Sequence, residues 1–189
     1  MLISRFNNIE NINERILELQ TKYNLALEKK YIEFLTNYNG GETPKTEICI
    51  NRKKFDIRGF FGFDCSKKMY DFEHILQYDD VLECIKKKWF PIARNYFGDL
   101  YYLVAISLEK NQEVLKYHDS NTVKNITDSF EEMILNGKSK KNGHIRTIEE
   151  RKNDMIKAGF GDRITDISIS CWQEEIDKYK DMKQELIVI

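Results

Sequence analysis

The sequence predicts an α+β domain followed by a helical extension, because stretches of helical and of strand periodicity occupy separate parts of the chain. Apolar residues recur at steps of three and four over residues 9–38, whereas residues 46–118 contain short runs in which polar and apolar side chains alternate. Helical spacing returns after residue 147. The length of 189 residues, 41% of them hydrophobic, is enough for one domain with an appendage.

Two N-terminal helices are predicted, each with one apolar face directed at a core. The first face consists of Ile9, Ile12, Ile16, Leu19 and Tyr23. The second consists of Leu27, Tyr31, Phe34, Leu35 and Tyr38. The second helix runs into Asn39-Gly40-Gly41, where glycine supplies the left-handed backbone geometry that closes a helix.

The central part of the chain predicts strands with two short helices among them. A hairpin is expected over residues 46–50 and 54–57, turning at Asn51-Arg52, and a third strand over residues 59–63. Short helices follow over residues 72–76 and 81–89. Three more strands are expected at residues 91–93, 100–106 and 113–118. A helix carrying Phe130, Met133 and Ile134 then ends at Gly137.

The polar, basic segment 138–143 is a linker candidate, so we divide the chain into a domain of residues 1–137 and a helical extension of residues 138–189. Thr147 and Glu150 have the spacing of a capping box, and a last helix is expected from Ser170. Its apolar stripe consists of Trp172, Ile176, Tyr179, Met182 and Leu186. We expect this stripe to pack on the same domain; a homo-oligomer contact or a cover over the partner site is the alternative.

Charge and hydropathy exclude two classes of protein. The 30 Lys and Arg residues balance 31 Asp and Glu residues, which is not the strongly basic composition of a dedicated nucleic-acid binder. No stretch approaches the roughly 18 apolar residues that cross a bilayer, and the N-terminus lacks the apolar core of an export signal. We therefore expect a cytoplasmic protein that neither enters a membrane nor binds nucleic acid directly.

The sequence contains no convincing catalytic or metal-binding motif. His74, His118 and His144 lie in separate segments, and no two of the four cysteines have the spacing of a zinc or redox motif. His118-Asp119 could supply a base and its orienting carboxylate, but no nucleophile lies nearby in the sequence. We expect no catalytic residues, no metal, no cofactor and four reduced cysteines, mostly buried.

The order of several short motifs resembles the SUKH superfamily over roughly residues 6–137. The motifs are Asn39-Gly40-Gly41 at a helix end, Phe60-Phe61-Gly62-Phe63, Pro91-Ile92-Ala93, Gly98-Asp99-Leu100, Val114-Leu115-Lys116-Tyr117-His118-Asp119 and Ile126-Thr127-Asp128-Ser129-Phe130-Glu131-Glu132-Met133. One departure is at residues 25–28, where this chain reads Leu-Ala-Leu-Glu and family members often have Leu-Pro.

The resemblance implies an α+β domain with a twisted, mainly antiparallel sheet flanked by helices. Bacterial members of this superfamily look like non-enzymatic immunity proteins that bind and neutralise a cognate polymorphic toxin, often a nuclease. The alternative is a regulatory or scaffold module similar to the fungal members, which look like regulators of cell-wall synthesis.

A nuclease has a basic phosphate-binding cleft, so carboxylates on an antidote would speed its encounter with the toxin. On this hypothesis we predict a partner-binding set of acids in loops and at element ends, together with aromatic anchors. The set consists of Asp64, Asp71, Asp79, Asp80, Asp99, Phe61, Tyr70 and Trp89. The alternatives are that the acids only solvate the surface and that the aromatic residues pack in the core.

Overall fold

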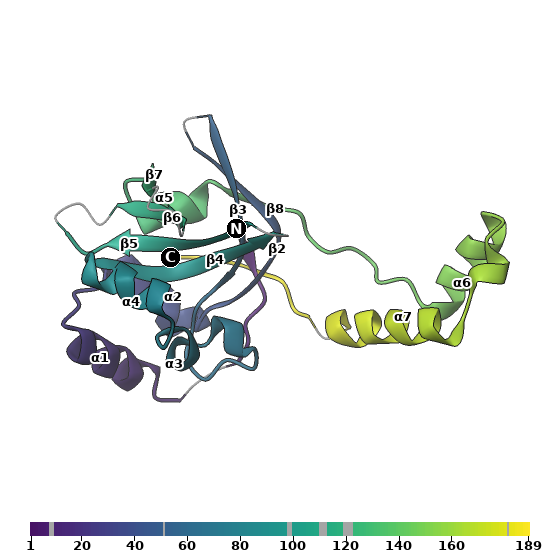
Figure 1. Ribbon diagram of the computed structural model, residues 1–189, viewed down its shortest axis with the longest axis horizontal. Helices are drawn as coiled ribbons and strands as arrows, with labels where there is room; N and C mark the ends of the chain where they lie inside the picture. The colour runs from purple at the N-terminus through teal and green to yellow at the C-terminus, as the bar shows by residue number, and fades with distance from the viewer. Residues whose placement is uncertain (8–9, 51, 98–99, 110–112, 119–122, 181) are drawn as a thin grey trace. The chain divides into compact units, whose positions relative to one another are not determined.

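A computed structural model describes residues 1–7, 10–50, 52–97, 100–109, 113–118, 123–180 and 182–189. These residues form two compact units (Figure 1). The first unit consists of residues 1–141 together with residues 184–189, and the second consists of residues 142–183.

The first unit is built on an antiparallel sheet, which confirms the predicted fold class. Its described strands lie in the order β7-β6-β5-β4-β3-β2-β8, and each is antiparallel to its neighbours. From β2 to β7 the order in space follows the order along the chain, so this part of the sheet is a meander. The strands are β2 (Gly41–Ile50), β3 (Lys53–Phe60), β4 (Trp89–Phe97), β5 (Leu100–Ser107), β6 (Val114–His118), β7 (Val123–Thr127) and β8 (Gly137–Ser139).

Helices flank this sheet (Figure 1). The described helices of the first unit are α1 (Ile12–Tyr23), α2 (Lys29–Tyr38), α3 (Phe72–Ile75), α4 (Asp79–Lys86) and α5 (Phe130–Leu135), with a 3₁₀ turn at Lys68–Tyr70. Of the predicted apolar faces, α1 buries Ile12, Ile16 and Leu19, and α2 buries four residues from Tyr31 to Tyr38. Ile9 lies outside the described residues. Ser129 caps the start of α5, because its hydroxyl accepts a hydrogen bond from the Glu132 backbone N–H.

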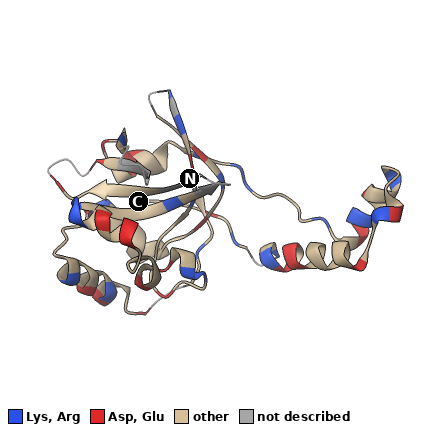
Figure 2. Ribbon diagram, in the orientation of Figure 1, with Lys and Arg blue, Asp and Glu red and all other residues tan. Residues whose placement is uncertain are grey.

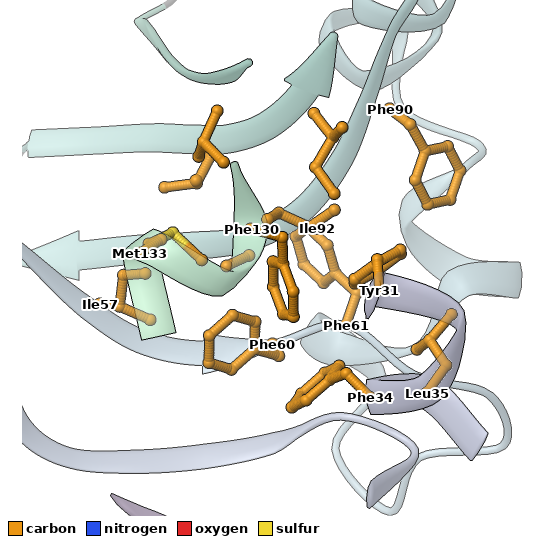
Figure 3. Close-up of a cluster of buried hydrophobic side chains, with 14 of the residues drawn as sticks. Tyr31, Phe34, Leu35, Ile57, Phe60, Phe61, Phe90, Ile92, Phe130 and Met133 are labelled. Carbon is orange, nitrogen blue, oxygen red and sulfur yellow. The ribbon is translucent and has the colours of Figure 1, made fainter. Parts of the chain in front are cut away.

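The core is an aromatic cluster between α2, α5 and the sheet (Figure 3). The Phe130 ring of α5 lies 5.2 Å from that of Tyr31 and 5.3 Å from that of Phe34, both on α2. The same ring is 6.0 Å from Phe60 at the end of β3. All four side chains are fully buried, and their edge-to-face contacts add to the free energy gained by removing them from water.

The ends of several elements differ from those that the sequence predicts. The helix expected to extend to Trp89 ends at Lys86, because Lys88 adopts a left-handed backbone conformation (φ 59°) that turns the chain into β4. The segment 59–63 is not a separate strand, since Gly59 and Phe60 complete β3. Gly137 begins β8 rather than ending a helix, and a Cβ there would lie 2.3 Å from the Met1 side chain.

The C-terminus returns to the first unit as a strand, where the sequence predicts helix. Helix α7 ends at Tyr179, and β9 (Glu185–Leu186) pairs with β1 (Leu2–Ile3). Beyond this strand the Ile187 N–H donates to the Met1 carbonyl over 3.0 Å, and the Val188 N–H donates to Tyr38 Oη over 2.8 Å. The side chain of Ile187 is 6% exposed, so the last residues are part of the core.

The second unit contains α6 (Ile148–Lys157), a 3₁₀ turn (Gly161–Arg163) and α7 (Asp166–Tyr179). The capping box predicted from Thr147 and Glu150 is present at the start of α6. Packing of this extension on the first unit stays a prediction.

A single buried side chain, Asn39, joins the end of α2 to the segment that follows β3. Its amide donates to the Phe63 carbonyl and accepts from the Phe63 N–H, each over 2.8 Å. Asn39 itself is left-handed (φ 49°). The glycines on both sides permit this contact, because a Cβ on Gly62 would lie 2.0 Å from the Asn39 carbonyl and one on Gly40 would lie 2.7 Å from that of Phe61.

Replacing the Asn39 side chain tests this junction. We expect Asn39→Ala to lower the free energy of unfolding by about 2–4 kcal/mol, because a buried donor and a buried acceptor lose their partner while the left-handed strain remains. Asn24→Ala is the matched control, since Asn24 ends α1 in the same conformation (φ 49°) and is exposed. Denaturant unfolding measures both variants, and equal losses would contradict the role given to the hydrogen bonds.

The C-terminal residues provide a second test. We expect Ile187→Ala to cost about 2–5 kcal/mol of stability through lost burial. Val188→Ala, at a neighbouring side chain that is 68% exposed, should stay within about 0.5 kcal/mol of the wild type. Both values come from urea titration of the full chain; an Ile187→Ala variant as stable as Val188→Ala would show that residues 184–189 do not belong to the core.

Candidate protein-interaction surface

A cleft opens between α1, Phe63 and α3, next to the Asn39 junction. Its volume is about 350 Å³. Buried apolar side chains form its floor, namely Leu19, Phe63, Phe72 and Leu76. Charged side chains surround the opening, namely Arg15, Glu18, Lys22 and Glu73. An apolar floor inside a charged rim is the arrangement in which protein interfaces place their anchor residues.

The loop between Phe63 and α3 is held by hydrogen bonds that fix the position of this cleft. Asp71 accepts from the His74 N–H (3.2 Å) at the start of α3 and from the Cys65 N–H (2.8 Å). The backbone of Gly62 accepts from the Phe72 N–H (2.8 Å) and donates to the Tyr70 carbonyl (3.0 Å). The carboxylate of Asp71 therefore has a structural use, as the cap of a helix.

Arg15 is the centre of the charged rim. Its Nη2 lies 2.5 Å from Glu73 Oε1 and 3.6 Å from Asp64 Oδ1, and its Nη1 lies 3.5 Å from Glu18 Oε2. The hydrogen bond to Glu73 raises the pKa of the Arg15 guanidinium above its ordinary value. One cation thus faces three carboxylates, and this group of four side chains carries a net negative charge.

Helix α4 carries a second group of acids. Asp79 and Asp80 occupy its first turn, where the helix dipole favours negative charge, and Glu83 follows one turn later. Lysines come after them, and Lys87 Nζ lies 5.6 Å from the Trp89 ring. Figure 2 shows both signs of charge on the ribbon of the first unit. None of these α4 residues lines the cleft.

The structure places the predicted partner-binding residues in different settings. Asp64 is exposed and belongs to the rim around Arg15, whereas Asp79 and Asp80 lie apart from it on α4. Phe61 is fully buried and Tyr70 is 3% exposed, so both are core side chains.

Of the rest, Trp89 is partly buried at the start of β4, and Asp71 caps α3 as described above. Asp99 lies outside the described residues. The assignment of all eight residues to a binding surface stays a prediction.

Sequence reasoning missed Arg15, Glu18 and Glu73. The first two lie beside the apolar stripe of α1, which marks them as residues at the border of a buried face. The contacts of Arg15 with Glu73 and Asp64 join residues that are far apart in the sequence, so no local sequence pattern predicts them.

Two of the four cysteines, Cys65 and Cys84, are buried as expected, whereas Cys49 is half-buried and Cys171 is exposed. Burial raises the pKa of both Cys65 and Cys84 to about 12, which keeps these two thiols protonated at neutral pH.

Among the described residues, no group of three or more His, Cys, Asp and Glu side chains could hold a metal ion. Asp119, the carboxylate of the His118-Asp119 pair, lies outside the described residues. No helix in the described part of the chain is long and apolar enough to cross a membrane.

Comparison with known proteins identifies a family for this chain. No curated protein and no solved structure matches the chain. The model of the SMI1 / KNR4 family (SUKH-1) matches residues 13–136, which is more than half of the sequence and confirms the resemblance carried by the motifs. The matched segment runs from α1 through α5, including the Asn39 junction and the cleft beside it, and the chain therefore belongs to the SMI1 / KNR4 family (SUKH-1).

Proposed function

We propose that this protein is a non-enzymatic immunity protein that binds and neutralises a cognate bacterial polymorphic toxin in the cytoplasm. Membership of the SUKH family carries the proposal, because proteins of this family act generally as immunity or regulatory proteins rather than as enzymes. A neutralising protein needs a complementary surface and no catalytic group of its own.

The cleft between α1 and α3 is the surface on which we place the toxin. Its floor of Leu19, Phe63 and Phe72 offers an apolar socket, and burying a partner's side chain there would supply the hydrophobic part of the binding free energy. The position of Phe63 in this floor is fixed, because the Asn39 side chain hydrogen-bonds both the N–H and the carbonyl of the Phe63 backbone. A preformed socket loses little conformational entropy on binding.

The acidic rim supports a basic partner. Glu18, Asp64 and Glu73 outnumber the two cations of the rim, Arg15 and Lys22, and Asp79 and Asp80 add negative charge on α4. A nuclease toxin presents a basic phosphate-binding cleft, so these carboxylates would steer it and occupy the place of phosphate groups. Because the whole chain has a formal charge of −1, this matching is local.

Co-expression with the toxin encoded in the neighbouring gene tests the function. We expect the protein to rescue growth of cells that produce the toxin and to form a stable complex with the purified toxin. Absence of rescue together with absence of binding would contradict the immunity function. A neighbourhood of housekeeping genes without a toxin gene would favour the regulatory alternative.

Charge reversal at the rim tests the surface. We expect Glu73→Lys to lower the association rate with the toxin about tenfold at low salt, and the difference from wild type to shrink as salt screens the charges. Glu149→Lys makes the same change of formal charge in the second unit and is the matched control. Stopped-flow binding measures both rates, and denaturant unfolding checks that each variant is folded. Equal rates for the two variants would remove the cleft from the interface.

A further inference from the structure

Helices α6 and α7 form a unit that leaves its apolar residues incompletely covered. None of the described residues of segment 142–183 is buried. The partly exposed apolar residues of α7 are Ile169, Trp172, Ile176 and Tyr179. Those of α6 are Ile148 and Met155. Segments of about this size rarely fold without a further stabilising partner, of which association with another chain is a common kind.

The spacing on α7 indicates that this partner is a helix. Ile169, Trp172, Ile176 and Tyr179 follow one another at steps of three, four and three, which is the repeat of a helical coiled coil. We call this row the α7 seam. In the same repeat Asp166, Gln173 and Lys180 occupy equivalent positions on one flank of the seam, seven residues apart.

The other flank of the α7 seam is already occupied by α6. Arg151 Nη1 of α6 lies 2.7 Å from Glu175 Oε2, and the Arg151 side chain is only 11% exposed. The hydrogen bond to Glu175 raises the pKa of the Arg151 guanidinium. An additional helix would therefore approach from the flank that carries Asp166, Gln173 and Lys180.

We propose that α7 pairs in antiparallel orientation with α7 of a second copy of this chain. Equivalent flank positions face each other in such a pair, and the two-fold axis passes beside Gln173. Asp166 of each copy then lies opposite Lys180 of the other, so the dimer contains two complementary charge pairs. Trp172 of one copy packs against Ile176 of the other, and this covers the α7 seam.

The sequence of α7 suits this orientation. In the antiparallel pair each flank faces the same flank of the other helix, so opposite charges meet at both ends, whereas in a parallel pair this flank would face the flank that carries Glu175, which α6 already occupies. Lys180 Nζ also donates to Asp177 Oδ1 of its own helix over 2.8 Å, and an ammonium group has donors for both carboxylates. The pairing does not depend on the immunity function, because it uses no residue of the cleft.

Sedimentation equilibrium of the full chain over a range of concentrations tests the proposal. We expect the wild type to dimerise reversibly. Asp166→Lys and Lys180→Asp each place like charges opposite one another twice in the dimer, and each should raise the dissociation constant about tenfold. The double variant restores opposite charges and should recover most of the lost affinity.

Two features make this experiment decisive. Glu174→Lys is the matched control, because it makes the same charge change as Asp166→Lys on the side of α7 that faces away from the seam. Asp166→Lys and Lys180→Asp also each place a charge that the dipole of α7 disfavours, so the helix itself is least stable in the double variant. Recovered affinity in the double variant must therefore come from the charge pairs between the two copies.

A chain that stays monomeric up to its solubility limit would overturn the proposal. The first unit or a toxin would then be the partner that covers the α7 seam. A dimer that weakens equally in Asp166→Lys and Glu174→Lys, or that the double variant does not recover, would overturn it as well.

Discussion

The pair of hydrogen bonds between Asn39 and the backbone of Phe63 is the constraint on which the first unit depends. It closes α2, which delivers Tyr31 and Phe34 to the core, and it fixes the segment that leaves β3 for α3. Only glycine at positions 40 and 62 lets the two backbones come this close. The same contact thus connects the stability of the core with the floor of the cleft, because Phe63 belongs to both.

Much of this fold is visible in the sequence where the determining pattern is local. The apolar stripes predict α1 and α2, because a helix brings residues three and four apart onto one face, and the capping box at Thr147 depends on four consecutive residues. Strands β7 and β8 were not predicted, since β8 consists of Gly137, Lys138 and Ser139 and has no apolar side chain to mark it. Leu186 continues the spacing of α7, yet it pairs with Leu2 at the opposite end of the chain.

The candidate surface was predictable only in part for a related reason. A loop acid such as Asp64 can be picked out by its position, but its neighbour Arg15 comes from a different helix. The carboxylate of Asp71 is used to cap α3, and Phe61 and Tyr70 are enclosed by the fold. Exposure and pairing are properties of tertiary packing, and a linear pattern of acids and aromatic residues does not contain them.

Because β9 pairs with β1, the chain leaves the first unit and later returns to it. Leu2 pairs with Leu186 of β9, and its N–H donates to Ser139 Oγ of β8 over 2.8 Å, so the points where the chain leaves and rejoins the first unit are tied to one residue. Because the entropy of closing a loop grows only with the logarithm of its length, the intervening segment can lengthen, shorten or be exchanged at little cost to the sheet. The first unit therefore places only a weak constraint on the length of residues 142–183, because Leu2 holds both β8 and β9, which precede and follow that segment.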